Sequence, residues 1–248
     1  MTENKKVALV TGANKGIGFE TARQLAQQGI TVLVGARDES RGTEAAEKLK
    51  TENLDAHFLH LDVDDLQTHE AARKFIEENF GVLDILVNNA AIAIDEFKSG
   101  VLIPTSETPL DIYRKTFETN FFNLIALTQT LLPLVKKSDA GRIVNLSSVL
   151  GSLTLHSDPT SPFYDYKVPA YDISKTALNA FTVHLAYELK DTPVLVNAAH
   201  PGYVSTDMND NQGPMAVEDG AKTSVHLATL PVDGFTGKFI HLGEELPW

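Results

Sequence analysis

The sequence predicts an α/β protein built on one doubly wound parallel sheet of about seven strands with helices on both faces. Two observations lead to this class. Short runs rich in Val, Ile and Leu alternate along the chain with longer segments of helical periodicity, and such alternation places crossover helices over both faces of a parallel sheet. The 248 residues, 43% of them hydrophobic, show no break in composition, so we expect one domain over residues 1–248.

Seven apolar runs have the composition of buried strands. In chain order they are VALVT (7–11), TVLVGA (31–36), AHFLHL (56–61), DILVNN (84–89), RIVNLS (142–147), VLVNAA (194–199) and GKFIHL (237–242). Six stretches between them have helical periodicity and a helix-forming composition, namely 16–28, 39–50, 66–79, 109–136, 170–190 and 216–229. Pro133 should kink or end the fourth helix, because proline lacks the N–H that a helix interior requires.

Two connections look irregular, residues 91–108 and residues 151–169. The second contains three prolines, two aspartates and three aromatic residues. Ligands of doubly wound sheets bind at the carboxyl ends of the strands, where long connections gather. We therefore expect both segments to line a pocket, with aromatic residues and a histidine facing it: Tyr113, His156, Phe163, Tyr164, Tyr166 and Tyr203.

Composition limits the classes of partner. A formal net charge of −12, with no local cluster of Lys and Arg, disfavours nucleic acid and anionic membranes. The absence of cysteine excludes disulfides, thiolate metal sites and a cysteine nucleophile, and no apolar stretch approaches a membrane span. His57 and His60 fall on opposite faces of a strand, so no metal site is expected. These features indicate a cytoplasmic protein that acts on a small molecule.

The stretch TGANKGIG (11–18) follows the first strand and opens the first helix. Its glycines, Gly12, Gly16 and Gly18, allow a tight turn and let bare backbone approach a pyrophosphate at the helix N-terminus. This context is typical of a Rossmann-type dinucleotide site. The alternative is a tight strand-to-helix turn with no ligand.

Three cations surround the expected position of the adenosine ribose. Dinucleotide sites that select NAD carry an Asp or Glu at the end of the second strand, whereas this strand ends in Arg37, with Arg41 one turn later and Lys15 in the glycine loop. A 2′-phosphate would be paired there, which favours NADP(H). The alternative is that both arginines are solvated partners of Asp38 and Glu39, and Asp38 leaves use of NAD open.

The segment YDISK places Tyr171 and Lys175 four residues apart on one helix face. A nearby ammonium lowers the pKa of a tyrosine, which makes Tyr171 a candidate proton donor. Ser147 and Ser148 end the fifth strand at the same edge of the sheet and could donate a hydrogen bond to a substrate carbonyl. The alternatives are a structural Tyr–Lys pair and a serine that caps a turn.

Together these motifs resemble the short-chain dehydrogenase/reductase family over essentially the whole chain. The resemblance is carried by TGANKGIG, LDV (61–63), NNA (88–90), an Asn in the fourth long helix, the serine before the 151–169 connection, YDISK, and HPGYVSTDM (200–208). Within the family the chain is most similar to the carbonyl-reductase branch, which generally uses NADPH. Relatives often read NNAG, whereas this chain reads NNAA at 88–91.

The resemblance implies four catalytic residues. Tyr171 would be the acid/base residue, Lys175 would lower its pKa and hold the nicotinamide ribose, and Ser148 would orient the carbonyl. Asn120 would position a water for proton supply, the alternative being a helix polar group bonded to neighbouring backbone. The 22 residues between Ser148 and Tyr171 exceed the spacing of many relatives and fall short of the monomeric carbonyl reductases, which leaves the substrate and the oligomeric state, monomer or homo-oligomer, open.

The resemblance also implies the cofactor contacts. Asp62 and Val63 would meet adenine, Asn88 the adenosine side, and Val204 with Thr206 the nicotinamide carboxamide. The full expected set is Gly12, Asn14, Lys15, Gly16, Ile17, Gly18, Arg37, Arg41, Asp62, Val63, Asn88, Tyr171, Lys175, Val204 and Thr206.

We therefore expect reversible, NADPH-dependent reduction of a ketone or aldehyde carbonyl. Two alternatives stay open: an enzyme like the 3-oxoacyl-carrier-protein reductases, and a non-catalytic NADP-binding regulator. A regulator would be expected to have lost Tyr171 or Lys175, and both are present.

Overall fold

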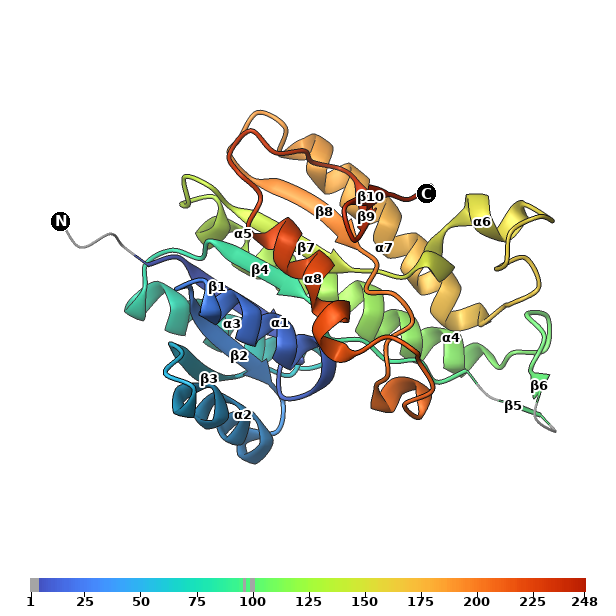
Figure 1. Ribbon diagram of the computed structural model, residues 1–248, viewed down its shortest axis with the longest axis horizontal. Helices are drawn as coiled ribbons and strands as arrows, with labels where there is room; N and C mark the ends of the chain where they lie inside the picture. Colours follow the sequence, from blue (N-terminus) through green and yellow to red (C-terminus); the bar gives the residue numbers. More distant parts are fainter. Residues whose placement is uncertain (1–4, 96, 99–100) are drawn as a thin grey trace.

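The computed structural model describes residues 5–95, 97–98 and 101–248 (Figure 1). Within them the main sheet has eight strands in the order β10-β9-β8-β7-β4-β1-β2-β3. The strands are β1 (Val7–Thr11), β2 (Thr31–Ala36), β3 (Ala56–His60), β4 (Ile85–Asn88), β7 (Arg142–Leu146), β8 (Leu195–Ala199), β9 (Phe239–His241) and β10 (Glu244–Glu245). The seven expected strands are confirmed with ends shifted by at most two residues, and the doubly wound parallel class is confirmed with them.

Strand β10 was not expected from the sequence. It pairs antiparallel with β9 across a two-residue turn, in which Leu242 and Gly243 have φ values of 46° and 91°. Positive φ at both central positions is the geometry of a tight hairpin turn. A strand of only two residues is too short to show an alternating pattern in the sequence. The turn before it also contains a leucine in the left-handed region, where sequence patterns predict glycine or asparagine.

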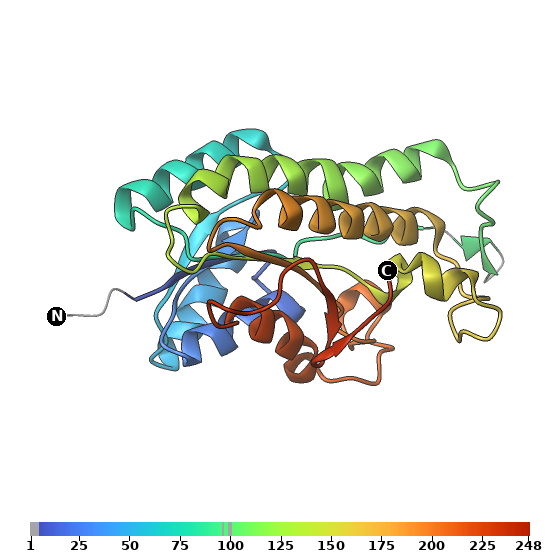
Figure 2. The ribbon, with the colours of Figure 1, turned by 90° about the horizontal axis from the view of Figure 1, so that it is seen from above.

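Helices cover both faces of the sheet, as Figure 2 shows from above. One face carries α1 (Gly16–Gln27), α2 (Glu39–Thr51) and α8 (Val217–Ala228), and the other carries α3 (Leu66–Asn79), α5 (Asn123–Val135) and α7 (Pro169–Glu188). The apolar residues of β1 alternate between the two cores, because successive strand side chains point to opposite faces. Ala8 and Val10 lie in the core under the first helix group, and Val7 and Leu9 in the core under the second.

The segment expected as one helix over 109–136 forms three elements. They are α4 (Leu110–Phe117), a π-helical turn (Glu118–Phe122) and α5. Pro133 lies inside α5, which ends two residues later, so the helix ends close to where proline predicts it. π-Helical turns are rare in proteins, and those that do occur are often found at functional sites. This one contains Asn120.

The two connections expected to be irregular contain short elements. Residues 91–108 include the hairpin strands β5 (Phe97–Lys98) and β6 (Val101–Leu102), and residues 151–169 include α6 (Leu153–Ser157) after the 3₁₀ turn Val149–Gly151. Figure 1 shows α6 and the hairpin at the end of the molecule toward which the β4 arrow points, together with the start of α7. None of the helices over residues 5–95 and 101–248 has the length and apolar character needed to cross a membrane.

Candidate active site

The glycine loop is fixed to the end of β4 by polar contacts. Thr11 Oγ1 accepts hydrogen bonds from the backbone N–H groups of Asn89 and Ala90, both at 2.9 Å, and Asn89 Nδ2 donates to Thr11 O at 2.7 Å. Helix α1 starts at Gly16, and the side chain of the N-cap Lys15 makes no capping hydrogen bond. The first turn of α1 therefore retains the positive end of its dipole for a ligand.

The glycines differ in what surrounds them. A Cβ on Gly18 would lie 2.5 Å from Asn89 Nδ2 and 2.6 Å from Gly12 O, so the chain contacts itself there. Gly16 has φ +57°, and its nearest neighbour would be Thr206 Cγ2 at 3.9 Å. Gly16 and the methyl group of Thr206 are thus neighbours at the N-terminus of α1, the position at which the sequence predicts a dinucleotide.

The loop that carries Thr206 is held internally and reaches the glycine loop through one ion pair. Thr206 and Asn209 form a capping box, and Val204 is paired with Met215. Lys15 Nζ lies 2.6 Å from Asp207 Oδ2, both side chains being largely exposed. Lys15, which the sequence grouped with Arg37 and Arg41, is therefore paired with Asp207.

Arg37 and Arg41 are both exposed at the start of α2. The intervening Asp38 caps this helix, since its Oδ1 accepts a hydrogen bond from Arg41 N at 2.9 Å. Its second oxygen lies 3.9 Å from Arg41 Nε, which fits the alternative of a surface pair. The Asp38 carboxylate, which could otherwise bind a ribose hydroxyl, therefore accepts a hydrogen bond from the first turn of α2. Arg37 is exposed directly after β2.

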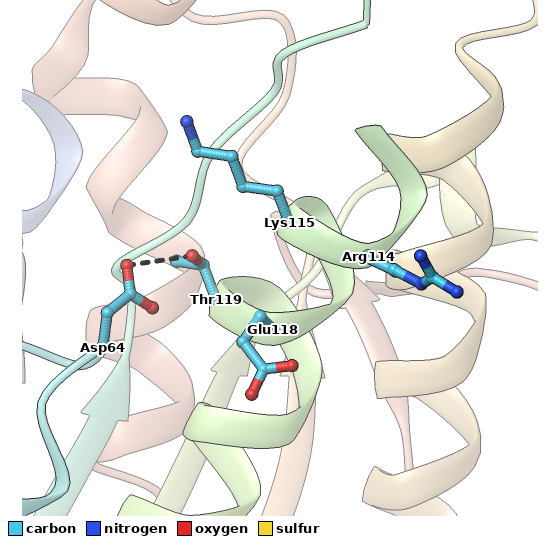
Figure 3. A pocket seen from close by; sticks show the side chains of 5 residues that line it. All are labelled: Asp64, Arg114, Lys115, Glu118 and Thr119. Carbon is cyan, nitrogen blue, oxygen red and sulfur yellow. Dashed lines mark hydrogen bonds between the residues drawn. The ribbon is translucent and has the colours of Figure 1, made fainter. Parts of the chain in front are cut away.

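The loop with Asp62 and Val63 follows β3 and is anchored to the π-turn. Asp64 accepts hydrogen bonds from Thr119 Oγ1 and Asn123 Nδ2, both at 3.0 Å. Figure 3 shows the first of these contacts. The expected adenine-contacting segment and the turn that carries Asn120 are therefore joined by hydrogen bonds.

A surface hollow of about 300 Å³ lies beside this anchor, lined by Asp64, Arg114, Lys115, Glu118 and Thr119. The cationic side chains of Arg114 and Lys115 point away from each other in Figure 3. None of these five lining residues was expected to bind the cofactor or the carbonyl. The hollow adjoins the expected adenine segment only at Asp64 and Thr119, which form the anchor.

The side chain of Asn88, expected on the adenosine side of the cofactor, is directed into the protein interior. It is buried, and its Nδ2 donates to Thr128 Oγ1 at 3.0 Å and to Asn145 Oδ1 at 2.9 Å. This side chain links β4 to α5 and β7 inside the protein. Its neighbour Asn89 supports the glycine loop instead, because adjacent residues at a strand end project in opposite directions.

Ser147 and Ser148 have different surroundings. Ser147 Oγ donates to Asn179 Oδ1 at 2.6 Å inside the protein, whereas Ser148 caps the following 3₁₀ turn by accepting from Leu150 N at 3.2 Å. The turn packs against α7 at Gly151, where a Cβ would lie 2.8 Å from the carbonyl carbon of Lys175. This close approach brings Ser148, the serine implied by the resemblance, to the helix of Tyr171 and Lys175.

Tyr171 and Lys175 lie one turn apart on α7, with Lys175 Nζ 5.6 Å from the centroid of the tyrosine ring. Lys175 is buried and donates to Leu146 O at 2.8 Å. Burial lowers the pKa of Lys175 to about 7 and raises the pKa of Tyr171 to about 12, against an opposing hydrogen bond with Ser148. The expected lowering of the tyrosine pKa is not seen here, because burial and the nearby charge of Asp172 raise it and the hydrogen bond with Ser148 opposes them only in part.

Asn120 is fully buried in the π-turn and all its amide groups have protein partners. Its Nδ2 donates to Ile92 O at 2.8 Å and to Ser174 Oγ at 3.1 Å, and its Oδ1 accepts from Ile92 N at 2.8 Å. This arrangement matches the alternative in which the side chain bonds neighbouring backbone. Asn120 therefore joins the loop after β4 to α7, one residue before Lys175.

Comparison with known families agrees with this geometry. The model of the family described as short chain dehydrogenase matches residues 6–216. The chain belongs to this family. Carbonyl reductase [NADPH] 3 from Mus musculus is 37% identical over 270 residues, covering 94% of both chains, and salutaridine reductase from Papaver bracteatum is 36% identical over 297 residues, covering 96% of this chain and 95% of its own.

Solved structures of this family share the fold. Salutaridine reductase from Papaver somniferum superposes with a TM-score of 0.82 at 31% identity, covering 95% of this chain and 99% of that one. The NADPH-bound carbonyl reductase from chicken fatty liver has a TM-score of 0.83 at 25% identity, with 99% of this chain and 95% of that chain covered.

Two site residues were missed from the sequence. Asn89 could have been found, since it belongs to the NNA motif that was assigned to its neighbour. Asp95 could not, because its carboxylate accepts from backbone N–H groups of Ala170 and Tyr171, about 75 positions away, and no local pattern signals such a contact.

Proposed function

We propose that this protein reduces a ketone or aldehyde carbonyl to an alcohol with NADPH, in a reversible reaction. The observation that carries the proposal is the grouping of Ser148, Tyr171 and Lys175 at the carboxyl edge of the sheet, the edge at which the glycine loop and the start of α1 also lie. A family member with this arrangement has both a cofactor position and a proton donor.

The chemistry divides between cofactor and protein. The reduced nicotinamide, when bound, supplies a hydride to the carbonyl carbon. Ser148 and Tyr171 donate hydrogen bonds to the carbonyl oxygen, which stabilises the negative charge that develops there. The raised pKa of Tyr171 keeps its hydroxyl protonated near neutral pH, and this is the form that delivers the proton.

Lys175 is suited to resupply that proton. Its ammonium lies on the same helix face as Tyr171, and burial brings the pKa of Lys175 to about 7, at which an amine exchanges protons readily near neutrality. Asn120 contributes by holding Ile92 and Ser174 in place, which fixes the turn of α7 that carries the lysine.

NADPH is the proposed cofactor because of the charges at the end of β2. Asp38 is used as a helix cap, and we expect the exposed Arg37, together with Arg41 once it turns from Asp38, to pair with a 2′-phosphate. The relatives named as NADPH carbonyl reductases, such as the mouse protein, support this choice.

The test is a binding titration followed by turnover. Purified protein is titrated with NADPH and NADH while nicotinamide fluorescence is followed, and then a panel of ketones, aldehydes and quinones is added while absorbance of the reduced cofactor is monitored. We expect tighter binding of NADPH and its carbonyl-dependent oxidation. Binding of neither nucleotide would contradict the proposal, and NADPH binding without turnover of a wide panel would favour the non-catalytic regulator.

A further inference from the structure

The first turn of α7, which contains Tyr171, is capped by an aspartate from a distant loop. Asp95 Oδ1 accepts a hydrogen bond from Ala170 N at 2.8 Å, and Asp95 Oδ2 accepts one from Tyr171 N at 3.1 Å. The helix's own N-cap, Val168, has no side-chain acceptor. Both oxygens of one carboxylate therefore satisfy two consecutive N–H groups that a helix start leaves unpaired.

This cap connects the proposed proton donor to the cofactor side of the sheet. Asp95 lies three residues after Ile92. The backbone of Ile92 is held by Asn120, whose Oδ1 accepts from Ile92 N and whose Nδ2 donates to Ile92 O, both at 2.8 Å. The loop that leaves β4 is thus fixed at Ile92 and in turn fixes the start of α7. A carboxylate at a helix N-terminus also gains from the helix dipole, and its bonds to N–H groups are charge-assisted.

We propose that Asp95 is a positioning residue for Tyr171: its two backbone hydrogen bonds set the orientation of the first turn of α7 and so direct the tyrosine hydroxyl toward the carbonyl oxygen. The proposal rests on the proposed role of Tyr171 in carbonyl reduction. Displacement of a catalytic group by about 1 Å is enough to lower a rate by up to two orders of magnitude, so loss of this cap affects turnover more than cofactor binding.

A second carboxylate, Asp172, belongs to the same turn and also accepts a hydrogen bond from a backbone N–H group. Its Oδ2 accepts from Val168 N at 2.8 Å and lies 3.5 Å from His156 Nε2; its Oδ1 is buried and has no hydrogen-bond partner in the described part of the chain. Burial raises the pKa of Asp172 to about 7, and the negative charge of Asp95 adds to the rise. The charge of Asp95 thereby helps to keep its neighbour protonated.

Charged and titratable groups reach this turn from each adjoining element. Lys167 Nζ lies 2.8 Å from His156 Nδ1, and His156 Nε2 lies 2.9 Å from Leu150 O. The groups around Asp172 are therefore Asp95 from the loop after β4, His156 from α6, Tyr166 and Lys167 from the 151–169 connection, and Tyr171 from α7 itself. Removal of Asp95 changes the balance of charge in this cluster as well as the cap.

The experiment compares Asp95→Asn and Asp95→Ala with a matched control at the opposite edge of the sheet. Asp84 also accepts two hydrogen bonds with its two oxygens, from Val7 N at 2.8 Å and Ser138 Oγ at 2.6 Å, and it is remote from Tyr171. For each protein we would measure kcat and KM for the carbonyl, Kd for NADPH, and Tm between pH 5 and pH 8.

We expect Asp95→Asn to lower kcat about tenfold and Asp95→Ala to lower it further, with Kd for NADPH within threefold of wild type. Asp84→Asn should lower Tm and leave kcat within twofold. A fall in kcat with an unchanged Kd for NADPH is the result that a purely structural cap would not give. The pH at which Tm declines because Asp172 ionises should also move to lower values in Asp95→Asn, because the negative charge of Asp95 is removed.

Wild-type kcat in both Asp95 variants would overturn the inference, as would an equal loss of kcat in Asp84→Asn. If Asp95→Ala does not fold, Asp95→Asn, which keeps an acceptor oxygen, still decides the question. An inactive wild type would count against the proposed function, whereas active wild type with fully active Asp95 variants would count against the positioning role alone.

Discussion

Replacing Gly16 by Ala tests whether the space at the N-terminus of α1 is the cofactor site. Gly16 has φ +57°, and a Cβ there would meet only Thr206 Cγ2, at 3.9 Å, among the described residues. An alanine held in the left-handed region costs roughly 1–2 kcal/mol. For a chain of this size that corresponds to a fall in Tm of roughly 2–8 °C.

Gly29 supplies the matched control. Its φ is +82°, and a Cβ there would meet nothing within 4 Å. The residue follows α1 at the end away from the site, so Gly29→Ala imposes the same kind of backbone strain without touching the cofactor space. Both variants should therefore lose similar stability in thermal unfolding.

The two variants should differ in NADPH binding. The methyl group of Gly16→Ala enters the space assigned to the pyrophosphate, so Kd should rise at least about tenfold, equivalent to about 1.4 kcal/mol, whereas Gly29→Ala should bind as wild type does. Fluorescence titration at a temperature where both proteins are folded measures this. NADPH binding by Gly16→Ala within twofold of wild type would refute the placement of the cofactor.

Three further predictions concern charge. Arg37→Asp should weaken NADPH at least about tenfold more than NADH in the same titration; equal weakening would mean that this arginine does not meet the 2′-phosphate. Arg142→Met should lower Tm by roughly 6–12 °C, because the buried guanidinium donates to carbonyls that include Leu230 O at 2.8 Å and their loss leaves buried acceptors unpaired at a cost of about 3 kcal/mol; an unchanged Tm would contradict this. The folded-state pKa of Asp172, about 7, lies above its ordinary 3.8, so its contribution to stability is complete below about pH 4 and is lost as pH rises through 7. Asp172→Asn should accordingly have a higher Tm than wild type between pH 5 and pH 8, and its free energy of unfolding should exceed that of wild type by up to about 4 kcal/mol. A difference in Tm between the two proteins that stays the same at every pH would count against ionisation of the buried Asp172.

The fold was largely predictable because buried strands leave continuous apolar runs. The five residues of β1 are all buried, and so are the six of β2, so each is recognisable without reference to the rest of the chain. The π-turn at Glu118–Phe122 was not predictable, since the helical periodicity of 109–136 continues across it. Its backbone is set by the contacts that Asn120 makes with Ile92 and Ser174, which exist only after folding.

The site was predictable in its residue types and less so in their contacts. The motifs place Ser148, Tyr171 and Lys175 at one edge of the sheet, but the pKa values of the tyrosine and the lysine depend on burial, which reversed the direction expected for the tyrosine. A short motif also does not reveal which of two neighbouring asparagines points into the protein interior and which one holds the glycine loop. Asn88 and Asn89 were distinguished only by the hydrogen bonds of the folded chain.

Replacement of Tyr171 by Phe tests the central claim most directly. The substitution removes the hydroxyl and keeps the ring, so NADPH binding should stay within about twofold of wild type while kcat for carbonyl reduction falls by 10²–10⁴-fold, the usual worth of a positioned acid. Steady-state oxidation of NADPH and a fluorescence titration of the same preparation give both values. A variant that keeps more than about a tenth of the wild-type kcat would show that Tyr171 is not the proton donor.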